Sequence, residues 1–331
     1  MAWNKGARKL ASWALSLAVS GVLLYFALRG VEWRAVWRTI AGARWAYLAI
    51  VCGMTSGSFL LRALRWRILL NAEARFSLPT VFWANMAGYL GNNFLPARAG
   101  EVLRSVLISR RSALSNTYVL TTALAERLMD VIALVLWSSL ILLNVPAKPA
   151  WMEGISRTLA LAAAAGAIGV LVLPHSEGLV EAMLRRIPLP HGLRARLLKL
   201  AEQVLLGLRA FHNWGRLAGF VFLTVAIWLM DACGAMVTAY ALGLHFTFAM
   251  AMLLLAGLGL GSALPSTPGY VGVYQFAAVS VLAPFGISRD AALAYILVMQ
   301  ALAYAIVTAY GLPGLYLLRG KSAVAMAAAK E

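Results

Sequence analysis

Uncharged runs long enough to cross a bilayer set the strongest limit on how this chain can fold. A helix needs about 20 apolar residues to cross the hydrocarbon core, because each residue adds about 1.5 Å. Five uncharged runs approach or reach that length: 10–28, 45–61, 131–147, 158–176 and 291–318. A sixth, 232–288, is 57 residues long and must cross or enter the membrane more than once. We therefore expect one polytopic, all-α integral membrane domain over residues 1–331, with about six spanning helices.

Composition and charge agree with this prediction. Only 12% of the residues are charged, against about 25% in an ordinary soluble domain. The net charge of +17 would suggest nucleic acid in a soluble protein, but 20 of the 29 Lys and Arg residues fall in five segments outside the apolar runs. If these segments are cytoplasmic, the positive-inside rule predicts a bacterial-type inner-membrane protein with both termini in the cytoplasm. The five segments are 1–9, 62–75, 98–111, 176–213 and 319–331.

Four arginines count against this orientation, which would place Arg29, Arg34, Arg38 and Arg44 outside. Tryptophans and branched aliphatic residues are interspersed with them at helical spacing. That pattern predicts an amphipathic helix lying in the membrane interface.

Two hydrophobic segments carry too many polar and helix-breaking residues for a simple span. Residues 76–97 include Asn85, Gly88, Gly91, Asn92, Asn93 and Pro96, and residues 247–264 are followed by a Pro/Gly-rich run up to Gly272. Irregular backbone survives at membrane depth only where protein or water satisfies it. We therefore expect two broken, re-entrant segments, at 77–96 and 247–285, which enter from opposite faces.

An internal repeat relates these two places. At a constant offset of 169, residues 87–102 and 256–271 share six identities in 16 positions. We expect a first copy over 1–145 and a second over 155–331, which carries an amphipathic cytoplasmic insertion at 177–212. Three crossings per copy would invert the second copy, and inverted repeats with broken segments are typical of transporters.

The sharpest group of intramembrane charges is Glu126, Arg127 and Asp130, which share one broad side of a helix. Since one guanidinium cannot neutralise two carboxylates, the group needs a further partner, for which Arg98 and Arg104 are candidates. Two interpretations stay open. The group is an interhelical clamp, or it lines a cavity in which an arginine binds a lipid phosphate through its planar fork.

Other charged residues in or near the spans are candidates for different roles. Asp231 is the one charge deep in its span and is a candidate for proton coupling, for pairing with an arginine, or for a protonated carboxyl. Arg62, Arg65 and Arg67 end the second span beside Trp66, and we expect them to be snorkelling anchors.

The sequence carries none of the common catalytic motifs. The glycines at 257–261 follow no strand, so they do not predict a dinucleotide site. No zinc-protease motif, no Cys/His cluster, no P-loop and no nucleophile elbow occurs. We therefore expect no metal, no cofactor and no enzyme activity.

Three motifs together resemble one family. They are P-x-R-x-G-E-x-x-R at 96–104, E-R-x-x-D at 126–130 and P-G-x-x-G at 268–272. In this order they resemble the lysylphosphatidylglycerol synthase transmembrane region, also called the flippase-like domain family, over nearly the whole chain. Bifunctional members carry a soluble aminoacyl-transferase domain after the membrane part, so this chain resembles the stand-alone form. Members often have a Glu shortly after the last Gly, where Tyr274 and Gln275 stand here.

The resemblance implies lipid handling without naming the lipid. We expect a transporter that moves an anionic or polyprenyl-linked lipid between leaflets through a polar cavity between inverted halves. The alternative is an intramembrane enzyme, or an accessory subunit of lipid or envelope-glycan synthesis. The expected partners are membrane lipids and not nucleic acid, while a homo-oligomer or envelope-biosynthesis partners stay open. The candidate substrate-binding residues are Asn92, Asn93, Arg98, Glu101, Arg104, Glu126, Arg127, Asp130, Pro268, Gly269, Gly272, Tyr274 and Gln275.

Overall fold

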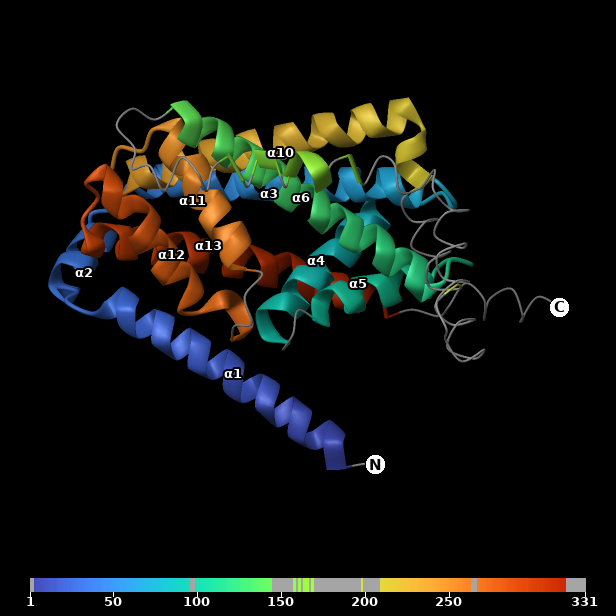
Figure 1. Cartoon of the computed structure of the whole chain (residues 1–331), viewed down its shortest axis with the longest axis horizontal. Coiled ribbons are helices and arrows are strands. Elements are labelled where there is room, and N and C mark those ends of the chain that lie inside the picture. Colours follow the sequence, from blue (N-terminus) through green and yellow to red (C-terminus); the bar gives the residue numbers. More distant parts are fainter. Residues whose placement is uncertain are drawn as a thin grey trace. The chain divides into compact units, whose positions relative to one another are not determined.

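The computed structural model describes residues 3–95, 99–144, 209–262 and 267–319, together with parts of 157–169 and Leu198. Within these ranges the chain is helical apart from short connections, and it contains no strand. The helices are α1 (Trp3–Leu28), α2 (Trp33–Ala41), α3 (Trp45–Leu70), α4 (Leu78–Phe94), α5 (Ala99–Ser109), α6 (Asn116–Asn144), α10 (Trp214–Ala241), α11 (Phe248–Gly261), α12 (Val273–Leu282) and α13 (Arg289–Leu317) (Figure 1). Short 3-10 turns lie at η3 (Arg209–His212), η4 (Pro268–Tyr270) and η5 (Ala283–Phe285).

Several helices are long and apolar enough to cross a bilayer. Among the described residues, α3, α10 and α13 meet this test, and the end of α1 meets it together with α2, across a bend of 84°. The prediction of an all-α, multi-pass membrane protein is therefore confirmed, whereas three or four spans leave the predicted six unconfirmed. The insertion at 177–212 and the predicted span at 158–176 lie largely outside the described residues, as do residues 320–331 at the C-terminus.

The first predicted broken segment, at 77–96, is an intact helix over most of its length. Helix α4 runs without interruption from Leu78 to Phe94, so its glycines and asparagines do not break it. The break follows at Leu95, and α5 begins at Ala99. A buried polar side chain inside α4 is tolerated because Asn85 accepts a hydrogen bond from Arg104 on α5. The second segment is broken as predicted, because α11 ends at Gly261 and α12 begins only at Val273.

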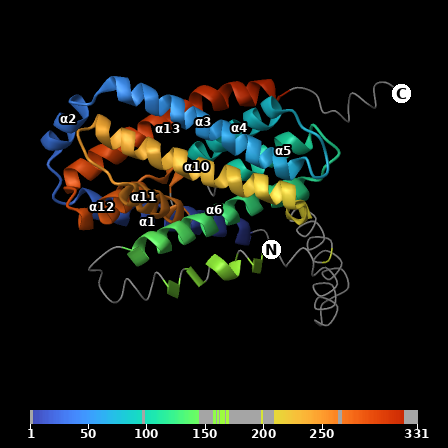
Figure 2. The ribbon, with the colours of Figure 1, turned by 90° about the horizontal axis from the view of Figure 1, so that it is seen from above.

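Glycine is required where the second break approaches α1. Helices α11 and α12 pack against each other, and α12 also packs against α1 (Figures 1 and 2). Gly272 has a φ of 87°, which side chains rarely adopt, and a Cβ there would overlap the backbone oxygen of Ser20 in α1. The contact is strengthened by the hydrogen bond of 2.9 Å that the Thr267 N–H donates to the Ser20 hydroxyl.

The chain forms two compact units, and the division falls inside five of its helices. Unit 1 comprises Met1–Ser58, Tyr89–Gly100 and Trp228–Tyr310, and unit 2 comprises Phe59–Gly88, Glu101–Ile227 and Gly311–Glu331. Helices α3, α4, α5, α10 and α13 each contribute residues to both units, α5 only its first two residues to unit 1.

Helices α3 and α10 are antiparallel within each unit. In unit 1 the start of α3 lies at the end of α10, where the Arg44 N–H donates to the Ala241 carbonyl at 2.8 Å. In unit 2 the end of α3 lies at the start of α10, where Arg65 donates to the Thr224 hydroxyl at 3.1 Å. Gly219 of α10 also lies against Ile68 of α3 in unit 2. The two helices therefore run in opposite directions wherever they meet.

Candidate functional site

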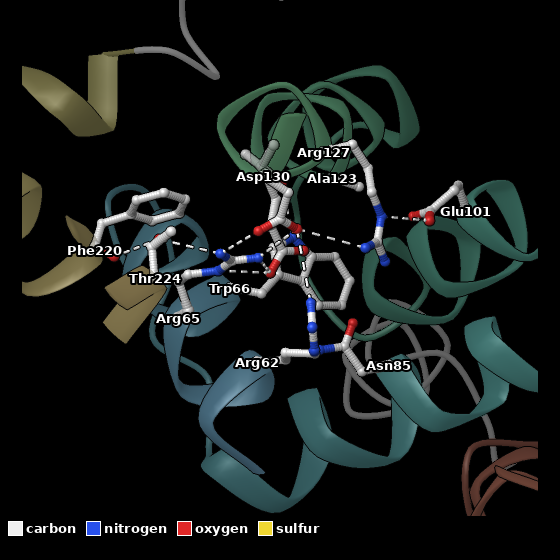
Figure 3. A network of polar contacts seen from close by, with 12 residues as sticks. Arg62, Arg65, Trp66, Asn85, Glu101, Ala123, Arg127, Asp130, Phe220 and Thr224 are labelled. Carbon is white, nitrogen blue, oxygen red and sulfur yellow. Dashed lines mark hydrogen bonds and ion pairs between the residues drawn. The ribbon is translucent and has the colours of Figure 1, made fainter. Parts of the chain in front are cut away.

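Unit 2 contains a cluster of charged side chains from three helices, which we call the arginine–carboxylate network. Helix α3 supplies two arginines, α5 supplies one arginine and one glutamate, and α6 supplies two carboxylates and one arginine (Figure 3). Its members are Arg62, Arg65, Glu101, Arg104, Glu126, Arg127 and Asp130.

Arg65 lies at the centre of the network. Its two terminal nitrogens donate to the two oxygens of Asp130 at 2.6 and 2.8 Å, and its guanidinium also donates to Glu126 at 3.0 Å. The guanidinium lies over the ring of Phe220, 5.1 Å from the ring centre. Its side chain is fully buried. The prediction that Arg65 is a snorkelling anchor is therefore wrong, because this residue points toward α6 and not toward the membrane surface.

Arg104 binds protein acceptors on several sides. It donates to Glu101 at 2.6 Å, to Glu126 at 3.0 Å and to the amide oxygen of Asn85. Its guanidinium lies 4.4 Å from the ring centre of Trp66. The side chain is almost completely buried. For Arg104 this geometry favours the interhelical clamp, since the donors that a phosphate would need are already directed at protein oxygens.

Arg127 is the most exposed guanidinium of the network. It donates to Glu101 at 2.9 Å and lies 3.6 Å from Asp130, yet 29% of its side chain is exposed, against 0% for Arg65 and 1% for Arg104. Burial alone would raise the pKa of Glu101, but the guanidiniums of Arg104 and Arg127 outweigh burial and lower that pKa to about 2. Glu101 is therefore ionised at neutral pH and anchors the partly exposed arginine.

Every carboxylate of the network is compensated by guanidiniums. Four guanidiniums contact the three carboxylates among the described members, and each carboxylate has at least two guanidinium partners. Opposite charges held this close together offset much of the cost of their burial.

Unit 1 contains a second polar network, and this one is neutral. Gln275 accepts from the Gly272 N–H at 2.8 Å and donates to Gln300 at 2.8 Å. Gln300 donates to the Gly269 carbonyl at 2.7 Å, and the hydroxyl of Tyr304 donates to the same carbonyl. Three predicted residues, the two glycines and Gln275, are thus brought together. Gln300 and Tyr304 were missed, because single polar residues within a long apolar helix carry no motif.

The remaining candidates that the structure describes all lie in unit 1. Asn92 and Asn93 end α4 in unit 1, where the Asn93 carbonyl approaches Gly269. Pro268 begins η4, and the ring of Tyr274 stacks on that of Tyr270 at 4.9 Å. Asp231 lies within α10, and its role in proton coupling stays a prediction. Arg98 lies outside the described residues.

The part of the chain that the structure describes holds no group of three His, Cys, Asp or Glu residues arranged to bind a metal. The two networks are therefore the candidate sites, one charged and one neutral, each beside a break between helices.

The network in unit 2 makes a testable prediction about stability. Arg65→Met should cost about 3–5 kcal/mol, because it leaves Asp130 and Glu126 buried without the charge-assisted hydrogen bonds that Arg65 donates to them. The double variant Arg65→Met/Asp130→Asn removes one charge of each sign and should recover part of that loss. Thermal melting of the purified protein in detergent measures both effects. Arg75→Met, at an exposed position outside the network, is the matched control.

If Arg65→Met melts at the same temperature as Arg75→Met, the network does not stabilise unit 2. If the double variant is less stable than Arg65→Met, charge balance is not the reason for the loss.

The family model described as the lysylphosphatidylglycerol synthase TM region matches residues 13–311 of the chain. No curated protein and no solved structure matches the chain. The matched range contains every described residue of both polar networks. The chain belongs to the family of the lysylphosphatidylglycerol synthase TM region, a membrane domain associated with lipid handling.

Proposed function

We propose that this protein is a lipid transporter that moves an anionic or polyprenyl-linked lipid between the leaflets of a bacterial-type inner membrane. The observation that carries the proposal is the arginine–carboxylate network, which places four guanidiniums and three carboxylates among the helices of unit 2. Buried charge within a membrane protein is expensive and is usually functional. The phosphate of a lipid head group is the anion that a bilayer supplies in quantity, and the arginine fork matches its geometry.

Recurring helix bounds support the internal repeat. Adding 169 to the bounds of α3 gives 214–239, against Trp214–Ala241 for α10, and the same step takes α4 to 247–263, against Phe248–Gly261 for α11. The bounds of α5 and α6 shift to 268–278 and 285–313, close to η4 with α12 and to α13. Each copy thus has a long helix, a short helix, a break, a short helix and a long helix.

The directions of α3 and α10 support inversion of the second copy. The offset of 169 residues relates α3 to α10, and the two helices are antiparallel within each unit. Helices at equivalent positions of inverted copies would have this arrangement. The unit boundary divides α3 after Ser58 and α10 after Ile227, two positions that also differ by 169. Inverted repeats with broken segments at matching places are the architecture on which many transporters build alternating access.

The two networks would have different tasks in transport. The network of unit 2 would attract the head group through its arginines, of which Arg127 has the most exposed side chain, while the neutral network of unit 1 would satisfy the irregular backbone at the second break. Because the second network is neutral, a phosphate there would meet no competing carboxylate among its described members. We propose that this asymmetry lets the protein attract a charged head group without holding it strongly at both breaks.

Transport of intact lipid tests the proposal. Proteoliposomes with purified protein should move labelled phosphatidylglycerol between leaflets faster than labelled phosphatidylcholine, because only the first carries a net negative charge. Protein-free liposomes of the same composition give the background rate. Chemical reduction of the label in the outer leaflet measures the movement, and mass spectrometry of the recovered lipid measures its integrity. A chemically altered lipid would favour the intramembrane enzyme, and rates equal to the background would contradict transport.

Cysteine labelling tests inversion of the repeat. In a protein whose native cysteines are replaced by serine, Glu73→Cys lies in the connection before α4 and Ala283→Cys lies after α12, and both positions are exposed. We expect an impermeant reagent added to whole cells to label Ala283→Cys but not Glu73→Cys, because the two helix pairs would enter from opposite faces.

Single cysteines at Ala2 and Ala329 extend the same experiment to the termini, which we propose to be cytoplasmic. Equal labelling of Glu73→Cys and Ala283→Cys in whole cells would contradict the inverted arrangement. Labelling of either terminus would reverse the proposed orientation.

A further inference from the structure

We propose that the exposed face of α2 is a binding surface for anionic phospholipids of the leaflet in which α2 lies, with Arg34 and Arg38 holding the lipid phosphate. The inference goes beyond the proposed transport, because α2 belongs to unit 1 and supplies no member of either polar network. The sequence predicts an amphipathic interfacial helix here. The direction of α2, its exposed face and the contacts of its charges add the binding partner.

The start of α13 holds α2 nearly at a right angle to α1. The two helices meet at 84°, and α2 turns away from α1 at the left of Figure 1. Arg289 donates to the backbone carbonyls of Phe26, at 3.3 Å, and of Arg29 at the end of α1. The Asp290 carboxylate accepts from the Glu32 N–H at the start of α2, at 2.9 Å. Both contacts complement the helix dipoles. With α1 crossing the membrane, a bend of this size directs α2 along the membrane surface.

Exposed aromatic side chains mark the level of the membrane surface at α2. The helix lies where α1 ends and α13 begins, and three residues beyond it the Arg44 N–H donates to the Ala241 carbonyl at the end of α10. At the ends of α1, α3 and α10, Tyr25, Trp45 and Tyr240 are 60%, 71% and 42% exposed. Tyrosine and tryptophan are enriched where a bilayer meets water. The aromatic residues therefore place α2 at the depth of the lipid head groups.

The exposed face of α2 has a tryptophan edge and an arginine edge. Val36 is fully buried, so the helix is covered on that side. Trp33 and Trp37 stand one turn apart and are 47% and 61% exposed. Arg34 and Arg38, also exposed, repeat this spacing one position later along the chain. With 3.6 residues per turn, the two edges lie side by side. A lipid can therefore lay its acyl chains against the tryptophans and its phosphate against the arginines.

The two arginines of α2 are not held by carboxylates. In the described part of the chain, no acidic side chain lies within ion-pair distance of Arg34 or Arg38. The Nε of Arg38 donates to the backbone carbonyl of Arg34 at 3.3 Å, which uses one of its five N–H donors. Like charges one turn apart on a helix repel each other. A phosphate between them relieves this repulsion, and the guanidinium fork matches its oxygens.

The same repulsion selects the class of lipid. A zwitterionic head group such as that of phosphatidylcholine carries a cation, which the arginine pair repels. The head group of phosphatidylglycerol has a phosphate and no cation. The surface should consequently prefer phosphatidylglycerol to phosphatidylcholine.

Photocrosslinking tests the surface, with the full-length protein in nanodiscs that contain phosphatidylglycerol or phosphatidylcholine with a photoreactive acyl chain. Peptide mass spectrometry measures the ratio of the two crosslinks at α2. We expect this ratio to favour phosphatidylglycerol and to fall about tenfold in Arg34→Gln/Arg38→Gln, which loses charge-assisted hydrogen bonds to the phosphate. Arg34→Lys/Arg38→Lys should be intermediate, because lysine keeps the charge and loses the fork. Trp33→Ala/Trp37→Ala should lower both crosslinks alike and keep the ratio.

The matched control is Arg75→Gln/Arg110→Gln, which removes two charges from exposed positions of unit 2 and should leave the ratio at α2 unchanged. An equal fall in the control would mean that total charge attracts the lipid, and would overturn the proposal. So would an unmodified protein without preference for phosphatidylglycerol at α2, or an unchanged ratio in a folded Arg34→Gln/Arg38→Gln variant. If that variant fails to melt cooperatively, the two single glutamine variants decide, and an unchanged ratio in both overturns the proposal. These outcomes do not depend on transport, so a failure of either proposal leaves the other intact.

Discussion

The contact of Arg65 with Asp130 and Glu126 is the interaction on which the rest of unit 2 depends. Two carboxylates one turn apart on α6 would repel each other in an apolar surrounding, and the Arg65 guanidinium binds both at distances of 2.6 to 3.2 Å. Arg104 then joins Glu126 to Glu101, so that α3, α5 and α6 are fixed at one point. With these two arginines directed inward, Arg127 is left as the most exposed guanidinium of the network.

The proposed internal repeat would pair a charged position of unit 2 with an uncharged one of unit 1. At the offset of 169, Glu126 corresponds to Tyr295. Glu126 accepts hydrogen bonds from Arg65 and Arg104, whereas the buried Tyr295 donates its hydroxyl to the Ala235 carbonyl at 3.3 Å. Such asymmetry would be expected of a transporter that recognises its substrate mainly through one half.

The membrane class, the family and the charges on α6 could be predicted because each follows from composition, periodicity or a run of nearby residues. The role of Arg65 could not, since an arginine near the end of an apolar run has the same local sequence whether it points inward or toward the head groups. Packing against α6 decides its direction. The intact α4 was also missed, because the amide oxygen of its buried Asn85 accepts a hydrogen bond from an arginine 19 residues away. Gln300 and Tyr304 can be recognised as members of a polar network only in the folded structure, where the carbonyl of Gly269 lies beside them.

The most direct test of the account is a solid-state NMR measurement of contact between arginine guanidinium nitrogens and lipid phosphorus, on labelled protein in phosphatidylglycerol bilayers. The Arg127 signal can be assigned by its absence in Arg127→Lys, and Arg65 serves as an internal control. We expect strong dephasing of the Arg127 guanidinium by phosphorus and none for Arg65, whose side chain is fully buried. Absence of a phosphorus contact at Arg127, or equal contacts at both arginines, would contradict the claim that the network recruits a lipid phosphate through its most exposed arginine.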